Sequence, residues 1–301
     1  MEILTVDIGG TFLKYARMAE DMTVLSRGKV KTPGTRDGLI ETIGKIYDKN
    51  PEIDGIAISM PGIIDSQRGY CAMGGALRYN DDFYIRQELY RRCPVAIYVA
   101  NDAKCAAMAE AAAGSLRDVE DGFVLLFGTM IGGGYIKDRR LHFGKHFAGG
   151  EVSFINTQRD SSPTADAIWG NQCGTPRLCA MYAQQKQLPP EQVDGVMVFD
   201  AANAGEPEAL ACLRQFTREI AVQIFNLQTI LDVERFAIGG GISAQPLFIE
   251  YIRNSLKALY AECPYYVPQA EVVCCKFQND ANLIGALQFF LTHGRTSTDT
   301  N

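Results

Sequence analysis

The sequence predicts an α/β fold made of two similar lobes, and three observations support this prediction. Strand-like and helix-like segments alternate along the chain, which is typical of α/β proteins. A pattern of strand, glycine turn and strand opens the chain at residues 3–18 and occurs again at residues 123–137. A chain of 301 residues is also long enough to divide into two domains, each with its own core.

The expected elements of the first lobe follow from hydrophobic patterning. Apolar runs bounded by glycine, proline or polar residues indicate strands, and apolar residues at helical spacing, such as Leu39, Ile43 and Ile46, indicate a helix. Pro94 and Gly114 end two of the expected helices. In order, we expect strands at 3–8, 13–18, 24–30, 56–59 and 95–100, and helices at 37–48, 82–92 and 103–113.

The second lobe repeats this opening and then becomes mainly helical. We assign residues 1–116 with 282–301 to a small N-terminal lobe and residues 117–281 to a large C-terminal lobe, with a cleft between them. The tail from Arg295 to Asn301 is expected to be disordered. The remaining elements are strands at 123–127, 134–137, 236–238 and 272–275, and helices at 165–184, 208–231, 245–260 and 282–291.

Composition and charge exclude several classes of protein. The net charge is −6 and the basic runs are short, so the chain lacks the basic face that a nucleic-acid partner requires. No apolar stretch reaches the roughly 18–20 residues of a membrane span, and the first residues lack the features of a signal peptide. We therefore expect a cytoplasmic protein. The odd number of cysteines, nine, then indicates reduced and mostly buried thiols.

Three glycine clusters follow apolar strands, at residues 9–10, 128–134 and 239–241. Glycine permits tight turns and lets backbone N–H groups approach an anion, so such clusters are candidate phosphate-binding turns. A single glycine pair is more often a plain turn, and none of the three matches the Walker or Rossmann pattern. Asp7 precedes the first cluster at the end of a buried strand, where a carboxylate suits Mg²⁺ held through water.

The dipeptide Asn101-Asp102 lies where an expected strand ends and a helix begins. Both residue types suit a helix N-cap, and that role alone would explain them. The functional interpretation is that Asp102 accepts the proton of an attacking hydroxyl, while Asn101 orients a neighbouring hydroxyl. Phosphoryl transfer needs mainly positioning, charge neutralisation and one base. The two interpretations are compatible.

Five segments resemble motifs of the ROK sugar kinases, which belong to the actin-like/hexokinase superfamily. Residues 7–14, Asp-Ile-Gly-Gly-Thr-Phe-Leu-Lys, match the first phosphate motif of that family fully. Residues 59–65 resemble its sugar-proximal strand with Pro61-Gly62, and residues 101–110 its catalytic segment. Residues 128–134 resemble its second phosphate motif, with Met130 at one glycine position, and residues 238–243 its adenosine motif. The matches run in the family's order over nearly the whole chain.

The resemblance implies a two-lobed actin-like ATPase (ribonuclease H-like) fold with duplicated domains, and a role for each matched residue. Asp102 would be the catalytic base, with Asn101, Glu151, Pro61 and Gly62 at the sugar. It also implies ATP and Mg²⁺ as cofactors, lobe closure that excludes water, a homodimer, and no nucleic-acid or membrane partner. The residues that would bind Mg·ATP are Asp7 (to Mg²⁺ through water), Gly9, Gly10, Thr11, Lys14, Gly128, Thr129, Gly132, Gly133, Gly239, Gly240 and Gly241.

The chain departs from the family at a structural zinc site and at two sugar contacts. Phe154 replaces the histidine of the Gly-Glu-x-x-His motif, and Cys173 alone remains of three zinc cysteines, because Cys179 is out of register. A structural zinc needs four ligands, so we expect no zinc. Ala180 stands where the family has a further sugar-binding glutamate. These changes favour a zinc-less branch that resembles β-glucoside kinase or N-acetylmannosamine kinase.

Two other classes compete with a sugar kinase. A transcriptional repressor of the same family would carry a helix-turn-helix of about 80 residues before the first phosphate motif. That motif starts at Asp7, so we do not expect a repressor. A non-catalytic sugar- or nucleotide-binding protein of the same fold is favoured by Met130 and by the lost sugar contacts. The joint presence of Asp7, Asn101, Asp102 and Glu151 argues against it.

Overall fold

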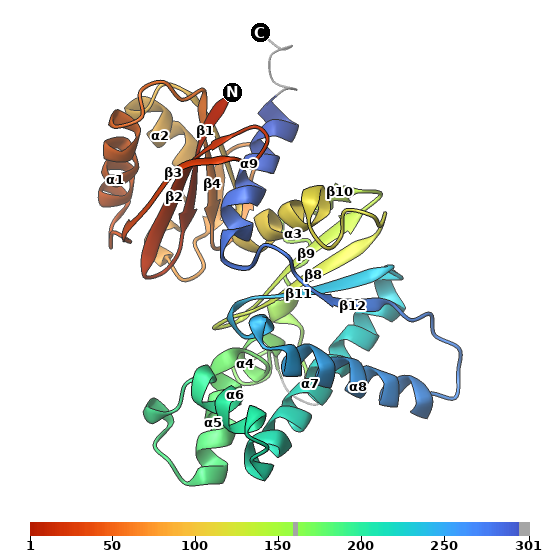
Figure 1. Ribbon diagram of the computed structural model, residues 1–301. Helices are drawn as coiled ribbons and strands as arrows, with labels where there is room; N and C mark the ends of the chain where they lie inside the picture. Colours follow the sequence, from red (N-terminus) through yellow and green to blue (C-terminus); the bar gives the residue numbers. More distant parts are fainter. Residues whose placement is uncertain (159–161, 295–301) are drawn as a thin grey trace. The chain divides into compact units, whose positions relative to one another are not determined.

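The computed structural model describes residues 1–158 and 162–294, so the tail expected to be disordered lies outside the described residues (Figure 1). The chain divides into two compact units. Unit 1 comprises Met1–Ala113, Leu141–Gly149 and the described residues from Asp280 on, and unit 2 comprises Gly114–Arg140 and Gly150–Asn279. The segment 141–149 therefore leaves unit 2 and packs with unit 1, an excursion that the division expected from the sequence does not contain.

Unit 1 is built on a five-stranded sheet with the order β3-β2-β1-β4-β7. β1 (Glu2–Ile8), β2 (Phe12–Ala19) and β3 (Val24–Lys31) pair antiparallel, while β4 (Gly55–Met60) and β7 (Ala96–Asn101) continue the sheet parallel to β1. All residues of β4 are buried, as expected for a central parallel strand that is covered on both faces. The carboxyl ends of β1, β4 and β7 consequently lie at one edge of the sheet.

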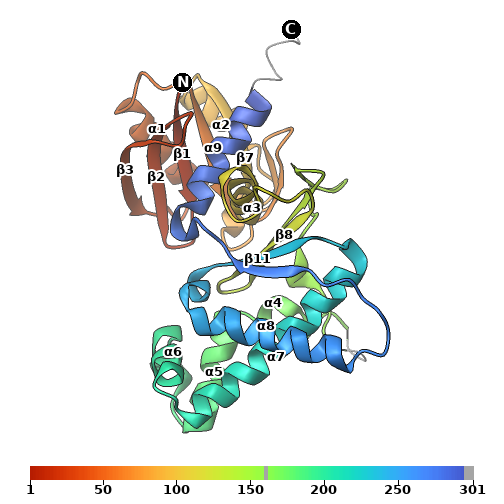
Figure 2. The same cartoon turned by 45° about the vertical axis from the view of Figure 1, so that its right-hand side comes forward.

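Helices cover both faces of this sheet (Figures 1 and 2). α1 (Arg36–Asp48) and α2 (Ile85–Arg92) share one apolar core with the alternate β1 residues Leu4, Val6 and Ile8. α3 (Asp102–Ala113) and α9 (Ala281–Gly294) lie on the opposite face, where α9 contacts β1, β4 and β7. The last helix of the chain therefore packs against its first strand.

α3 and α9 approach each other unusually closely. A Cβ atom added to Gly285 of α9 would lie 1.7 Å from the carbonyl oxygen of Cys105 on α3, so a residue without a side chain is required there. The buried side chains of α3 are mostly small, and they include Ala103, Ala106 and Ala107. The alanine-rich sequence of α3 thus permits backbone-to-backbone packing of the two helices.

The remaining elements of unit 1 follow β4. A hairpin of β5 (Ile63–Asp65) and β6 (Tyr70–Met73) forms a separate two-stranded sheet. A 3-10 turn, η1 (Arg78–Asn80), leads into α2, and η5 (Gln278–Asp280) leads into α9. The excursion 141–149 packs Phe143 against Phe289 of α9, with ring centroids 5.9 Å apart.

Unit 2 repeats the five-stranded arrangement, with the order β10-β9-β8-β11-β12. β8 (Gly122–Phe127) pairs antiparallel with β9 (Ile131–Lys137) and parallel with β11 (Arg235–Gly239), which pairs parallel with β12 (Glu271–Cys274). β10 (Arg140–Leu141) completes the sheet. The helices and 3-10 turns of this unit are η2 (Val152–Phe154), α4 (Trp169–Gln172), α5 (Thr175–Lys186), η3 (Pro190–Gln192), α6 (Gly195–Asn203), α7 (Pro207–Leu231), η4 (Gly241–Ala244) and α8 (Pro246–Glu262).

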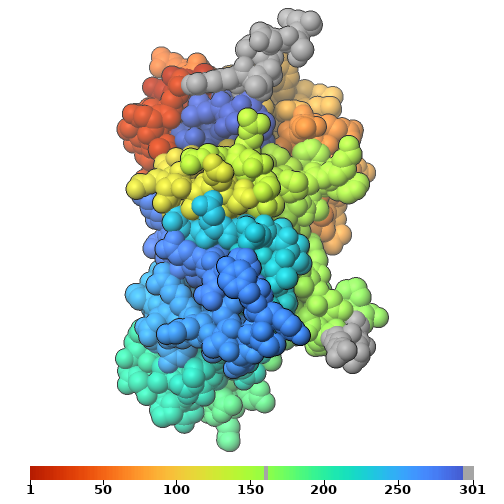
Figure 3. Space-filling view, turned by 90° about the vertical axis from the view of Figure 1, so that its right-hand side faces the viewer, coloured from red at the N-terminus to blue at the C-terminus, as the bar shows by residue number. Residues whose placement is uncertain are grey.

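The helices of unit 2 build its core on one face of the sheet. Phe216 and Ile220 of α7 and Phe248 and Ile252 of α8 are completely buried, in one cluster with Phe236 of β11. The connection between α8 and β12, drawn in blue, lies on the surface in the space-filling view (Figure 3). It carries Tyr265 and Tyr266, whose side chains are 80% and 92% exposed.

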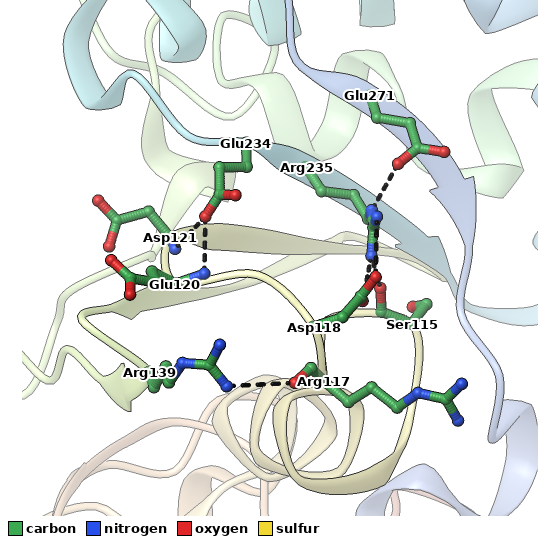
Figure 4. A network of polar contacts seen from close by, with 9 residues as sticks. All are labelled: Ser115, Arg117, Asp118, Glu120, Asp121, Arg139, Glu234, Arg235 and Glu271. Carbon is green, nitrogen blue, oxygen red and sulfur yellow. Dashed lines mark hydrogen bonds and ion pairs between the residues drawn. The ribbon is translucent and has the colours of Figure 1, made fainter.

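A polar network fixes the amino ends of β8, β11 and β12 in unit 2 (Figure 4). Arg235 forms ion pairs with Asp118 at 2.6 Å and with Glu271 at 2.7 Å, and it donates a hydrogen bond to the Ser115 carbonyl at 2.6 Å. The Glu234 carboxylate accepts the backbone N–H groups of residues 120 and 121 at 2.6 and 3.1 Å. These contacts leave the opposite, carboxyl ends of the strands available to other groups.

Most expected elements are present, and the differences have local causes. The single helix expected at 165–184 is wrong: α4 and α5 are separate, because Gly174 between them has an extended backbone with φ −73° and ψ 159°. α2 begins at Ile85 rather than at residue 82, since Asp82 has a φ of +52°. The strand expected at 134–137 begins at Ile131. The hairpin β5-β6 and helix α6 were not expected.

We predict that Gly285→Ala destabilises the protein, although alanine is the better helix former by about 1 kcal/mol. The added Cβ would overlap the Cys105 carbonyl, so α9 must shift, and we expect the free energy of unfolding to fall by about 1–3 kcal/mol. Urea denaturation measures the change. Gly34→Ala is the control, because a Cβ atom at Gly34 meets nothing within 4 Å. Equal stability of both variants would show that the contact between α3 and α9 tolerates a Cβ atom at residue 285.

Candidate functional site

The first glycine cluster forms the turn between β1 and β2. Gly9 N–H donates to the Phe12 carbonyl at 3.1 Å, and the Thr32 hydroxyl of the neighbouring segment donates to the Gly9 carbonyl at 2.6 Å. Gly10 and Thr11 are exposed at the tip of the turn, and a Cβ atom at Gly10 would meet nothing within 4 Å. The turn is thus fixed at its base and open at its tip, as an anion-binding turn requires.

Asp7 lies directly before this turn and is only 7% exposed. Its Oδ1 accepts hydrogen bonds from Ser59 Oγ at 3.1 Å and from Asn282 Nδ2 at 3.0 Å. Lys14 is its cross-strand partner on β2. Burial raises the pKa of the Asp7 carboxyl, and the bond from Asn282, the charge of Lys14 and the bond from Ser59 oppose that rise.

Ser59 and Asn282 were not identified from the sequence. Ser59 could have been found, because parallel pairing of the first and fourth strands places it beside Asp7. Asn282 gave no such signal, since 275 residues separate it from Asp7 and only the packing of α9 brings the two together.

Asn101 ends β7 and is 4% exposed. Its Oδ1 accepts the Lys104 N–H at 3.1 Å and so caps α3, while its Nδ2 donates to the Gly62 carbonyl at 2.9 Å. Gly62 has a φ of +108°, and a Cβ atom there would lie 1.9 Å from the Met73 carbonyl oxygen. The capping residue therefore also holds the Pro61-Gly62 turn that follows β4.

Asp102 is the first residue of α3 and is partly exposed. Its Oδ1 accepts the N–H of Ala103 at 2.8 Å, which fixes the orientation of the carboxylate. The buried thiol of Cys105 lies near both carboxylates: burial raises its pKa first, and the charges of Asp102 and then Asp7 raise it further. Unit 1 thus gathers Asp7, Asn101 and Asp102 at the carboxyl ends of its parallel strands.

In unit 2 the second and third glycine clusters lie together at the carboxyl ends of β8 and β11. Gly128 N–H donates to the Met130 carbonyl at 3.0 Å, and its own carbonyl accepts the Thr175 N–H of α5 at 2.8 Å. Gly240 has a φ of +91°, and a Cβ atom there would lie 2.2 Å from the Phe127 carbonyl oxygen. A Cβ atom added at Gly241 would meet nothing within 4 Å, and Gly241 is exposed, so its backbone is accessible to a ligand. Met130 therefore does not disrupt the turn, since its carbonyl closes it.

Gly132 and Gly133 lie within β9, opposite Leu126 and Leu125, rather than in the turn itself. Gly133 is required for packing, because a Cβ atom there would lie 2.2 Å from the Gly150 carbonyl oxygen. Gly239 likewise ends β11, where a Cβ atom would meet Leu126 and Cys275.

Glu151 follows Gly150 and is partly exposed at the start of η2. Two residues later, the buried Ser153 hydroxyl accepts the Ile131 N–H at 3.0 Å and donates to the Ile131 carbonyl. These bonds attach the Glu151 segment to β9, the strand that contains the second half of the second glycine cluster. Ser153 was not identified from the sequence, where it occupies an unspecified position of the Gly-Glu-x-x-His motif.

The segment that resembles a zinc site has a different environment here. Phe154 is 49% exposed, whereas Cys173 is buried with its Sγ 3.8 Å from Glu219 Oε2. Ala180 lies on α5 and is partly buried. Within residues 1–158 and 162–294, no group of three or more histidine, cysteine, aspartate or glutamate side chains is arranged to hold a metal ion. The absence of zinc remains a prediction.

No helix in the described part of the chain combines the length and the apolar character needed to cross a bilayer.

Comparison with known proteins agrees with this arrangement. The chain matches the ROK family over residues 3–293. A β-glucoside kinase of Klebsiella pneumoniae is 32% identical over 292 residues, covering 96% of both chains. The crystal structure of a ROK family protein from Streptococcus pneumoniae in complex with sucrose has a TM-score of 0.89 and 26% identity, covering 98% of this chain and all of that one. A ROK family glucokinase from Streptomyces griseus, solved with glucose and AMPPNP, has a TM-score of 0.84, 22% identity, and coverages of 96% and 99%.

The chain therefore belongs to the ROK family and has its actin-like ATPase fold. Relatives named β-glucoside kinase and glucokinase match the chain over nearly their whole length, which makes this chain an ATP-dependent carbohydrate kinase.

We predict that Asp7→Asn stabilises the ligand-free protein at neutral pH. The folded-state pKa of Asp7 is raised, so its favourable contribution is complete below the unfolded value of about 3.9 and is lost as the pH rises through the folded value. The amide oxygen can still accept both hydrogen bonds without a buried charge. The melting temperature at pH 7 should therefore exceed that of the wild type, and the difference should vanish near pH 4.

Asp21→Asn is the matched control. A hydrogen bond from the Thr23 N–H lowers the pKa of Asp21, so removing its charge should not raise the melting temperature at pH 7. A gain in both variants would mean that net charge, rather than burial of Asp7, controls stability.

Proposed function

We propose that this chain transfers the γ-phosphoryl group of ATP to a sugar hydroxyl, with Asp102 as general base. The proposed acceptor is the 6-hydroxyl of a hexose, amino sugar or β-glucoside. The observation that carries the proposal is the position of Asp102. It starts α3 at the carboxyl end of a parallel strand, with its Oδ1 held by the Ala103 N–H and Asn101 beside it. A base held in one orientation can accept the hydroxyl proton as the phosphoryl group is transferred.

Asn101 and the turn at Pro61-Gly62 are proposed to orient the sugar. The hydrogen bond from Asn101 Nδ2 to the Gly62 carbonyl keeps the two segments in register. Glu151 of unit 2 is proposed to accept hydrogen bonds from other sugar hydroxyls, and Ser153 fixes its segment through Ile131. Binding several hydroxyls at once converts the attack into a reaction between prepositioned groups.

The glycine clusters and Lys14 are proposed to bind the nucleotide. Gly9, Gly10 and Thr11 offer an open turn in unit 1, and Gly128 with Thr129 offers another in unit 2. Gly239 and Gly240 precede η4, which begins at Gly241. These three glycines are proposed to suit the adenosine part, because a Cβ atom added at Gly241 would meet nothing within 4 Å. Gly132 and Gly133 are proposed to support the second turn from within β9.

Asp7 is proposed to hold Mg²⁺ through water, and its surroundings fit that role. The site offers one carboxylate, and Mg²⁺ commonly keeps several waters and takes one or two carboxylates. Magnesium would neutralise negative charge on the phosphates. Asp7 would position it, and its two hydrogen-bond donors keep the carboxylate oriented despite burial.

The preferred substrate is proposed to be a β-glucoside. Relatives named as β-glucoside kinases match this chain at 32% and 28% identity over 96–97% of its length. Phe154 and Ala180 replace a histidine and a glutamate of the family motif by groups without hydrogen-bonding capacity. The Phe154 ring is 49% exposed and can therefore contact an added sugar or aryl group.

We predict that Asp102→Asn lowers kcat by about 10²–10⁴-fold, the usual worth of a positioned base. The amide oxygen can still accept the Ala103 N–H, so the start of α3 and the affinity for sugar should persist. A coupled assay measures kcat, and calorimetry measures sugar binding. Near-wild-type turnover would remove Asp102 from the mechanism.

We also predict that a β-linked glucose disaccharide is phosphorylated with a kcat/KM about 10-fold above that of glucose, since one apolar contact discriminates by about 10–200-fold. Phe154→Ala should lower kcat/KM for the disaccharide and leave that for glucose unchanged. An equal loss for both sugars would show that Phe154 does not contact the second sugar.

A further inference from the structure

The Asp7 carboxylate receives two neutral hydrogen-bond donors from segments far apart in the sequence. Ser59 comes from β4, and Asn282 comes from the first turn of α9. Both donate to the same oxygen, Oδ1, at 3.1 and 3.0 Å. A carboxylate oxygen offers two lone-pair directions, so these donors occupy the hydrogen-bonding capacity of Oδ1.

The other carboxylate oxygen, Oδ2, differs from Oδ1 in its hydrogen bonding. Across the described residues, the hydrogen bonds to the Asp7 side chain all end on Oδ1. Lys14, the cross-strand partner, acts on the carboxylate through its charge. Oδ2 is therefore the oxygen that remains for a water molecule bound to a cation.

The position of Asn282 is fixed by helix packing. Gly285 follows three residues later, which places it on the same face of α9, and that face is held against the Cys105 carbonyl of α3. The amino end of α9 also lies near the carboxylate, where the helix dipole favours negative charge. Asn282 thus reaches Asp7 from a rigid element.

We infer that Asn282 is a positioning residue, which orients Asp7 so that Oδ2 faces the hydrated magnesium of Mg·ATP. The inference rests on the proposed magnesium role of Asp7. It assigns a function to the last helix of the chain, none of whose residues was among the site residues expected from the sequence.

The test compares nucleotide binding with and without metal. Asn282→Leu keeps the side-chain volume and removes the donor. By calorimetry, we expect its Kd for Mg·ADP to rise about 10-fold, the worth of one hydrogen bond to a charged group. The Kd for ADP in excess EDTA should change less than twofold. In steady-state kinetics, the magnesium activation constant should rise and the KM for sugar should not.

Thr292→Ala is the matched control on the same helix. Thr292 is exposed, and its hydroxyl donates to the Gln288 carbonyl one turn earlier, so all these constants should remain at wild-type values. Asn282→Ala is the second variant if the leucine impairs folding, which the melting temperature reports.

A double-mutant cycle with Asp7→Asn separates the two proposals. If Asn282 acts through Asp7, Asn282→Leu should have no further effect on Mg·ADP affinity in the Asp7→Asn background. A persistent 10-fold loss there would overturn the inference, as would a loss of ADP affinity in EDTA. If Asp7→Asn alone leaves Mg·ADP affinity unchanged, the proposed magnesium role of Asp7 fails instead.

Discussion

The contact between α9 and α3 is the constraint on which the proposed catalytic unit depends. It brings the backbone of Gly285 against that of Cys105, with no room for a side chain. α3 begins with Asp102, and α9 carries Asn282 to Asp7. One packing contact therefore helps to position both Asp102 and Asp7, because a shift of α9 relative to α3 would move the Asn282 donor that holds Asp7.

This arrangement couples the two ends of the chain. Unit 1 is completed by the residues from Asp280 on, and the two segments of unit 2 lie between its parts in the sequence. Contacts so distant in sequence carry a cost in loop-closure entropy, which slows folding. The Asp7 environment consequently depends on the last helix, whereas the turn at Gly9 is made by local hydrogen bonds and contact with Thr32.

The sequence was sufficient for the fold class, the motifs and most elements, because these depend on local patterns. Asp7, Asn101 and Asp102 could be identified as strand-end residues for the same reason. Asn282 and Ser153 could not, since each acts through a contact with a segment distant in sequence, with Asp7 and with Ile131 respectively. Gly133 shows a different limit of motif matching. It belongs to a phosphate motif, yet a glycine is needed there because a Cβ atom would overlap the Gly150 carbonyl oxygen.

The Arg235 network and the proposed nucleotide site lie at opposite ends of the sheet in unit 2. The Arg235 network joins the amino ends of β8, β11 and β12, where its ion pairs have partners on two neighbouring segments (Figure 4). The glycine clusters occupy the carboxyl ends, where Gly128 and Gly240 leave backbone groups rather than side chains at the surface. Parallel strands place all carboxyl ends together, so a ligand there meets several turns at once. Side-chain contacts at the other end can then hold the strands without occupying the site.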